Sequence, residues 1–245
     1  MRALLIAPAD EKRLAEALKS GADAVIVDLA QVAPAERAAA RGIAAQLLKE
    51  TRGRSGPALI IRANPLDSGE TDADLDAVMA HAPAAILLPR SLGAASVQQL
   101  SAKLAVREAD FSLADGSTRI IAVADTAQSL FGMGSYRGAS ARLMGIAWSA
   151  ESLRNDIGAE TDRDGHGVYS GPYRQARDLT LLAATAAGVA AIDTAFADLH
   201  DKEGLRAEAV AARRDGFVGK MAIDPAQAAI IDEVFPSRIP PPAER

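Results

Sequence analysis

The chain has 245 residues, carries a formal net charge of −5 and contains no cysteine. The acidic balance and the absence of a long basic run disfavour nucleic acid and anionic membranes as partners. Without cysteine, disulfides, thiolate nucleophiles and Cys-ligated metal are excluded. The three histidines show no i,i+4 spacing, which also disfavours a His-based zinc site.

The apolar run at the N-terminus is far too short for a signal peptide, and nothing in the sequence reaches membrane-spanning length. We therefore expect a soluble, cytoplasmic protein. Hydrophobic residues make up 49% of the chain and aromatic residues only 4%. The core must therefore be built from Ala, Val, Ile and Leu, which is typical of helices packed around a parallel sheet.

Short apolar runs alternate with longer segments of helical character along the whole chain. The expected strands cover residues 3–7, 24–27, 58–61, 85–88, 120–124, 143–147, 189–192 and 219–223. The expected helices cover residues 11–20, 34–50, 71–81, 94–106, 172–187, 202–214 and 225–235. We expect a broken helix in residues 128–142 and a charged, glycine-rich loop in residues 148–171.

About eight such βα units in one chain of this length predict a single-domain (β/α)8 TIM barrel. A doubly wound open sheet is the alternative architecture, although no strand is followed by a Gly-x-Gly-x-x-Gly or P-loop pattern. We expect the barrel to occupy residues 1–235 and the proline-rich residues 236–245 to form a frayed tail.

Charged residues follow several of the expected strands. Since the carboxyl ends of all barrel strands meet at one mouth, these side chains should gather there. They are Asp28, Arg62, Arg90, Asp125, Asp193 and Asp224, with Glu151 just beyond the sixth strand.

Asp125 and Arg62 are the strongest site candidates among them. Asp125 ends the apolar fifth strand, where it serves either a site or the N-cap of the next helix. Arg62 is poorly explained by capping, because the positive end of a helix dipole would repel it. Its guanidinium fork suits a substrate carboxylate, with a structural ion pair to Asp28 or Asp125 as the alternative. We interpret Asp193 and Asp224 as helix-capping or rim residues.

Several stretches, in this order and spacing, resemble the citrate lyase β-subunit group of the HpcH/HpaI aldolase superfamily. The most distinctive are Ser20-Gly-Ala-Asp-Ala-Val-Ile-Val-Asp28, Ile61-Arg-Ala-Asn-Pro-Leu-Asp67, Asp125-Thr-Ala127, Ala150-Glu-Ser-Leu153 and Gly216-Phe-Val-Gly-Lys-Met-Ala-Ile-Asp-Pro-Ala-Gln227. The resemblance covers nearly the whole chain.

This resemblance implies a TIM-barrel carbon–carbon lyase or aldolase. Its substrates would be small oxo- or hydroxy-carboxylic acids or their acyl-CoA thioesters, with Mg²⁺ stabilising the enolate. It implies that Arg62 binds the substrate carboxylate and that Asp125 and the Ser152 position hold the metal. Because Ser152 is no carboxylate, we expect Glu151 or Asp224 to supply a further metal ligand from a shifted position. We also expect Asp28, Arg90 and Asp125 to contribute to substrate binding. Asp198 matches an acid presented to a neighbouring subunit, which implies a homo-oligomer, a trimer or hexamer.

The chain departs from the family pattern at the site. Asp125 replaces a glutamate, Ser152 replaces the second metal-binding carboxylate, and Arg90 replaces a lysine. Asp224 stands where the family has histidine, and residues 30–31 replace an acidic pair. The chain ends soon after the eighth helix, so we expect a short or absent C-terminal lid.

Two further hypotheses follow from these departures. A catalytically weak paralogue acting as a binding or accessory subunit would explain the loss of the carboxylate at Ser152. Metal-independent chemistry with Asp125 or Glu151 as general base is the third possibility.

Overall fold

The computed structural model of this protein is a closed barrel of eight parallel strands in sequential order, and it describes residues 1–235. The eighth strand pairs with the first, so no sheet edge is left open. This confirms the predicted (β/α)8 barrel and excludes the open-sheet alternative. The predicted tail, residues 236–245, lies outside the described residues.

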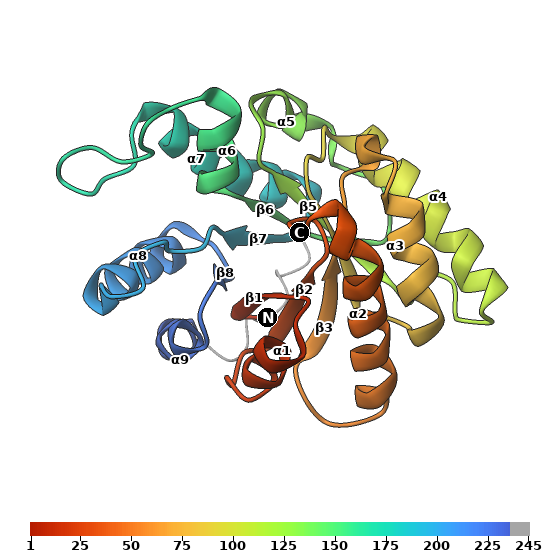
Figure 1. The fold of residues 1–245 in the computed structure, drawn as a ribbon. Coiled ribbons are helices and arrows are strands. Elements are labelled where there is room, and N and C mark those ends of the chain that lie inside the picture. The colour runs from red at the N-terminus through yellow and green to blue at the C-terminus, as the bar shows by residue number, and fades with distance from the viewer. Residues whose placement is uncertain (236–245) are drawn as a thin grey trace.

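The strands are short, and seven of the eight helices that cover them follow a strand directly (Figure 1). The strands are β1 Ala3–Pro8, β2 Ala24–Asp28, β3 Ala58–Arg62, β4 Ala85–Leu88, β5 Arg119–Ala124, β6 Leu143–Trp148, β7 Ala190–Asp193 and β8 Gly219–Ala222. The helices around them are α1 Glu11–Leu18, α2 Arg37–Thr51, α3 Thr71–Val78, α4 Ala94–Asp110, α5 Ala127–Gly132, α7 Gly171–Ala187, α8 Lys202–Asp215 and α9 Pro225–Val234.

One predicted loop was wrong, because residues 148–171 contain the additional helix α6 Ala150–Ile157. Ser149 caps its start by accepting a hydrogen bond from the Ser152 backbone N–H, and Gly158 ends it in the left-handed conformation. Ala150 and Leu153, three residues apart, bury one face. The remaining residues project from the barrel as the segment between α6 and α7 (Figure 1).

Successive side chains along each strand point alternately into the barrel and toward the helices, which divides the core into two layers. One cluster contains Leu4, Ile26, Ile121 and Met221 and fills the barrel interior. The larger cluster lies between the strands and the helices, and it includes Trp148, which is fully buried. None of the described helices is long and apolar enough to cross a membrane.

Closure of the barrel requires a close approach of β8 to the first residues of the chain. The Lys220 backbone N–H donates to the Arg2 carbonyl at 2.8 Å. A Cβ on Gly219 would lie 2.5 Å from the Met1 carbonyl oxygen and 2.7 Å from that of Arg2. Only glycine fits there without moving the backbone.

We therefore predict that Gly219→Ala lowers the free energy of unfolding by about 1–3 kcal/mol, because the two strands must separate to admit the methyl group. Urea denaturation measures this loss. Gly56→Ala is the matched control, since a Cβ there meets nothing within 4 Å. Equal stability of the two variants would contradict the packing argument.

Candidate active site at the barrel mouth

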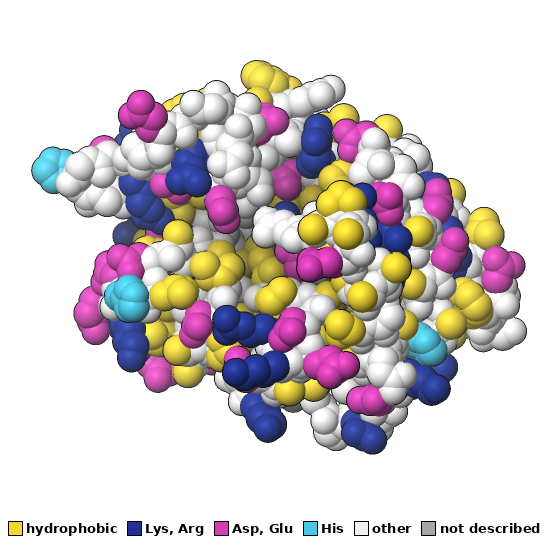
Figure 2. Space-filling model, in the orientation of Figure 1, with side chains coloured by type: hydrophobic (Ala, Val, Ile, Leu, Met, Phe, Trp, Pro, Cys, Tyr) yellow, Lys and Arg dark blue, Asp and Glu magenta, His cyan; other side chains and the backbone are white. Residues whose placement is uncertain are grey.

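A polar cavity opens at the carboxyl ends of the strands. Its charged lining comes from β2, β3, α6 and the segment between α6 and α7: Asp28, Arg62, Glu151, Asp162 and Arg163. Its uncharged polar lining is Gln31, Ser149, Ser152, Tyr169 and Thr194. On the face drawn in Figure 2, acidic and basic side chains are scattered among hydrophobic ones, and the centre is hollowed. The structure therefore brings together Arg62, Asp28, Glu151 and Ser152 of the predicted site.

Arg62 and Asp28 form a largely buried ion pair at the ends of neighbouring strands, with Nη1 3.0 Å from Oδ2. The structural ion pair expected as an alternative is thus present. The other oxygen of Asp28 accepts from the backbone N–H groups of Ala30 and Gln31. Within residues 1–235 this is the single ion pair of Arg62. Its remaining guanidinium donors can therefore bind a planar carboxylate.

Asp125 is buried and follows β5, but it does not cap the next helix. Thr126 is the N-cap of α5, in a reciprocal capping box with Ser129. Oδ1 of Asp125 accepts instead from the Arg90 backbone N–H at 2.7 Å. Burial raises the pKa of the Asp125 carboxyl to about 6, although that hydrogen bond and the positive charge of Arg62 oppose the shift. Asp125 is thus a buried acid whose charge is only partly compensated.

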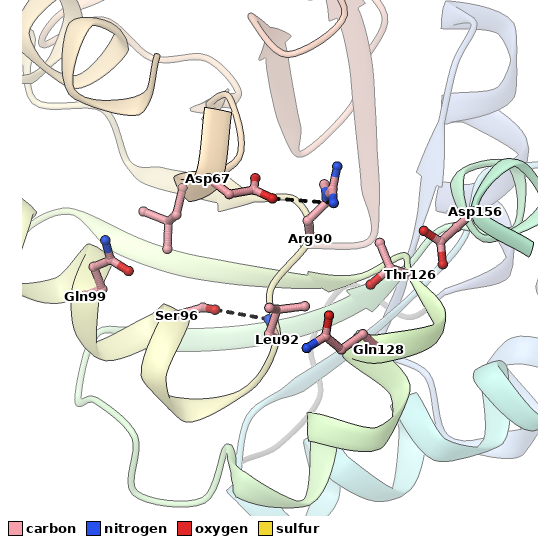
Figure 3. A pocket seen from close by; sticks show the side chains of 9 residues that line it. Asp67, Arg90, Leu92, Ser96, Gln99, Thr126, Gln128 and Asp156 are labelled. Carbon is pink, nitrogen blue, oxygen red and sulfur yellow. Dashed lines mark hydrogen bonds and ion pairs between the residues drawn. The ribbon is translucent and has the colours of Figure 1, made fainter. Parts of the chain in front are cut away.

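Arg90 acts on Asp125 through its backbone, and its side chain points elsewhere. It adopts a left-handed conformation at φ +51°, which is uncommon for a residue with a side chain. The guanidinium lies 3.4 Å from Asp67 in a second cavity at the rim, which Gln128 and Asp156 also line (Figure 3). The mouth cavity and the Arg90 side chain are therefore separate, and direct substrate binding by that side chain stays a prediction.

Glu151 and Ser152 are placed by the first turn of α6. Ser152 Oγ lies 3.0 Å from Ser149 Oγ, within the cap of the helix. Glu151 is exposed in the mouth cavity and forms no ion pair with the described part of the chain. It is therefore the available carboxylate on this helix, whereas Ser152 offers only a neutral hydroxyl.

Mg²⁺ sites typically use one or two carboxylates together with water and substrate oxygens. Among residues 1–235 no three Asp, Glu, His or Cys side chains gather closely enough to hold a metal ion. Asp125 and Glu151 each offer the carboxylate chemistry that Mg²⁺ prefers, but only Glu151 lines the mouth cavity, whereas Asp125 is buried. The donor set does not fit an all-protein cage.

Asp198 lies outside the mouth cavity. It is exposed in the loop after β7, where its Oδ1 accepts from the backbone N–H groups of His200 and Asp201. It lines a groove between α7, α8 and the segment that follows α6, and this groove adjoins the mouth cavity at Asp162, Arg163 and Tyr169. A role of Asp198 toward a neighbouring subunit stays a prediction.

We compared the chain with protein families, with known proteins and with solved structures. The family model described as HpcH/HpaI aldolase/citrate lyase matches residues 2–225. The chain belongs to this family. Citrate lyase subunit beta of Leuconostoc mesenteroides subsp. cremoris is 32% identical over 88% of this chain and 70% of its own length. A (3S)-malyl-CoA thioesterase of Cereibacter sphaeroides is 31% identical over 99% of this chain and 79% of its own.

Among solved structures, the citrate lyase beta subunit of Mycobacterium tuberculosis, complexed with oxaloacetate and magnesium, superimposes with a TM-score of 0.79. It is 30% identical, and the match covers 95% of this chain and 96% of the other. The family resemblance expected from the sequence motifs is therefore confirmed.

Sequence reasoning missed the buried network beneath the mouth. Asp193, expected to cap a helix or lie at the rim, is fully buried and pairs with Lys220 of β8 at 2.9 Å. Asp224 does cap α9, as expected. A lysine inside the apolar strand 219–223 was a usable signal, because a buried ammonium needs a buried carboxylate.

We predict that Asp125→Asn stabilises the protein in EDTA at pH 8. Because the carboxyl pKa of folded Asp125 is raised from 3.8 to about 6, wild type loses stability as pH rises between these values. The amide avoids this loss, worth up to about 3 kcal/mol for a shift of about two units. Urea denaturation at pH 8 and pH 4 should show a gain at pH 8 only. An equal gain in the exposed control Asp110→Asn would contradict this assignment.

We also predict that the backbone of Arg90 matters more for stability than its side chain. Arg90→Gly keeps the N–H donor to Asp125 and accepts a positive φ, whereas Arg90→Val must adopt a strained conformation. The valine variant should be less stable than the glycine variant by about 1 kcal/mol. Thermal unfolding of the two proteins measures the difference, and the reverse order would contradict the role of the backbone.

Proposed function

We propose that this protein is a carbon–carbon lyase that acts on a small oxo- or hydroxy-carboxylic acid or its acyl-CoA thioester. The observation that carries the proposal is Arg62, which keeps guanidinium donors available in the mouth cavity close to the buried acid Asp125. The names of its relatives include citrate lyase subunit beta and (3S)-malyl-CoA thioesterase, which favours this substrate class.

Retro-aldol cleavage needs a base for the substrate hydroxyl and a group that holds the substrate carboxylate in place. A base takes the proton of the hydroxyl group, the adjacent carbon–carbon bond breaks, and its electron pair passes to the neighbouring carbonyl as an enolate. Arg62 would hold the substrate carboxylate in a fixed orientation, with Asp28 fixing the guanidinium in turn. In the metal-independent form of this chemistry, Glu151, which is exposed in the cavity and has no ion pair within residues 1–235, would take the hydroxyl proton.

Asp125 and Glu151 would hold Mg²⁺, the ion present in the solved relative with oxaloacetate. When bound, the ion supplies positive charge to the carbonyl oxygen on which negative charge develops. Ser152 would contribute at most a neutral oxygen.

The second candidate function, a weakly active accessory subunit, is favoured by one observation. Ser152 stands where the resemblance implies a second metal-binding carboxylate, and its hydroxyl is engaged with Ser149 in the cap of α6. A protein of this kind would bind the carboxylate through Arg62 without turning it over.

We also propose a cytoplasmic homo-oligomer, a trimer or hexamer, in which Asp198 faces a neighbouring subunit. The exposure of Asp198 outside the mouth cavity of its own subunit supports this arrangement. Its test is the mass of the protein in solution, which would contradict the proposal if it were that of a monomer.

We predict that Arg62→Ala raises KM for oxaloacetate or (3S)-malyl-CoA cleavage roughly 10- to 100-fold, the loss expected for a charge-assisted carboxylate contact. Steady-state assays with and without excess EDTA measure this effect. Arg137→Ala, at an exposed arginine without an ion pair within residues 1–235, is the matched control.

The assays separate the hypotheses. Turnover that EDTA abolishes supports the Mg²⁺-dependent lyase, and turnover that survives EDTA indicates metal-independent chemistry. Calorimetric binding of oxaloacetate that depends on Arg62, without turnover of either substrate, would support the accessory subunit.

A further inference from the structure

The segment after α6 contains a small hairpin, residues 162–170, that joins the mouth cavity to the buried network. Its two arms are held by hydrogen bonds from the Asp164 backbone N–H to the Val168 carbonyl and from the Ser170 backbone N–H to the Asp162 carbonyl, both at 2.9 Å. Arg163 and Tyr169 form the bridge between the arms. The tip is exposed, and the whole segment projects from the barrel (Figure 1).

The base of the hairpin is a wall of the mouth cavity. Asp162, Arg163 and Tyr169 line it together with Arg62 and Asp28. Tyr169 is nearly buried, and its ring meets Trp148 edge-to-face with 5.2 Å between the centroids. Trp148 is the only tryptophan of the chain. Movement of the hairpin would therefore change both the shape of the cavity and the surroundings of this ring.

The guanidinium of Arg163 is held between the hairpin and the barrel. It stacks over the Tyr169 ring at 3.8 Å and donates to the Gly167 carbonyl at 2.9 Å. Its Nη2 donates to Glu208 Oε2 of α8 at 2.5 Å. This last contact is the ion pair between the hairpin base and a helix of the barrel.

Glu208 also reaches into the core on its other side. Its Oε1 accepts from Lys220 Nζ at 2.6 Å, and from the Tyr169 hydroxyl at 3.4 Å. Lys220 is fully buried and completes its donors with Asp193 and the Thr194 carbonyl. Burial alone would lower the pKa of the Lys220 ammonium, but the two carboxylates raise it above its ordinary value. The network therefore keeps the Lys220 ammonium charged and holds it in one position on β8.

We propose that Glu208 is a positioning residue, which fixes the 162–170 hairpin as a wall of the mouth cavity by bridging Arg163 to Lys220. One carboxylate satisfies a cation of the hairpin and a cation of the barrel, and it is itself almost buried. A loop with an exposed tip would otherwise be held mainly by the packing of Tyr169. The role in substrate binding rests on the proposed function, whereas the role in fixing the hairpin does not.

The test compares wild type with Glu208→Gln and with Glu203→Gln, an exposed glutamate in the first turn of the same helix. Two readouts are independent of any substrate. Acrylamide quenching of Trp148 fluorescence and chymotrypsin cleavage after Tyr169 should both rise in Glu208→Gln, cleavage by roughly tenfold, and should stay at wild-type values in Glu203→Gln. Unchanged quenching and cleavage in Glu208→Gln would overturn the proposal.

A third readout tests the wall itself. In Glu208→Gln, KM for the cleaved carboxylate should rise roughly tenfold while kcat stays within about twofold, because the reacting groups Arg62, Asp125 and Glu151 are unaltered. A loosened hairpin with an unchanged KM would also overturn the proposal. If wild type turns over no substrate, the proposed function fails, and fluorescence and proteolysis alone decide the role of Glu208.

Arg163→Gln provides a second variant should Glu208→Gln not fold. It breaks the same bridge from the hairpin side and leaves Lys220 with both of its carboxylates. The expected results are the same, and wild-type quenching and cleavage in this variant would contradict the bridge.

Discussion

Burial of carboxylates at the ends of the strands is the constraint on which the mouth of this barrel depends. Parallel closure brings the strand ends together, away from bulk water, so each acid there needs a partner. Asp28 is paired with Arg62, and Asp193 with Lys220. Asp125 has a backbone N–H and the more distant charge of Arg62, and its pKa is raised accordingly. The least compensated acid is therefore the one at which a cation or a proton is most strongly favoured.

The substitution at position 152 also affects how many acidic groups the mouth contains. The resemblance leads one to expect a second carboxylate at position 152, but the residue there is a serine that joins the cap of α6. Glu151, one position earlier, still brings a carboxylate into the cavity. The mouth cavity thus keeps the Arg62 guanidinium and the Glu151 carboxylate, and both roles stay predictions.

The hairpin at residues 162–170 illustrates how a barrel can fix an exposed loop beside its mouth cavity. Glu208 and Arg163 are 45 residues apart in the chain, and Lys220 belongs to a third element. Because Lys220 cannot leave the core without exposing unpaired carboxylates, the charge to which the hairpin is tied is rigid. Specificity for a substrate can then depend on Glu208, a side chain that does not line the mouth cavity.

The sequence by itself determined the barrel, the order of its strands and the family, because periodicity of apolar residues, glycine stops and motif spacing are local signals. It also placed Arg62 and Asp125 at the mouth, since any residue that ends a barrel strand must lie there. The helix α6 was missed because its eight residues carry only two buried positions, Ala150 and Leu153, between glycine-rich and charged stretches.

Tertiary structure alone decided which side chains and backbone groups are partners. It paired Arg62 with Asp28, gave the cap of α5 to Thr126, and joined Arg90 to Asp125 through a backbone N–H. It also linked Lys220, Glu208 and Arg163 across three elements. Such choices depend on distances between residues far apart in the chain, which no local pattern encodes.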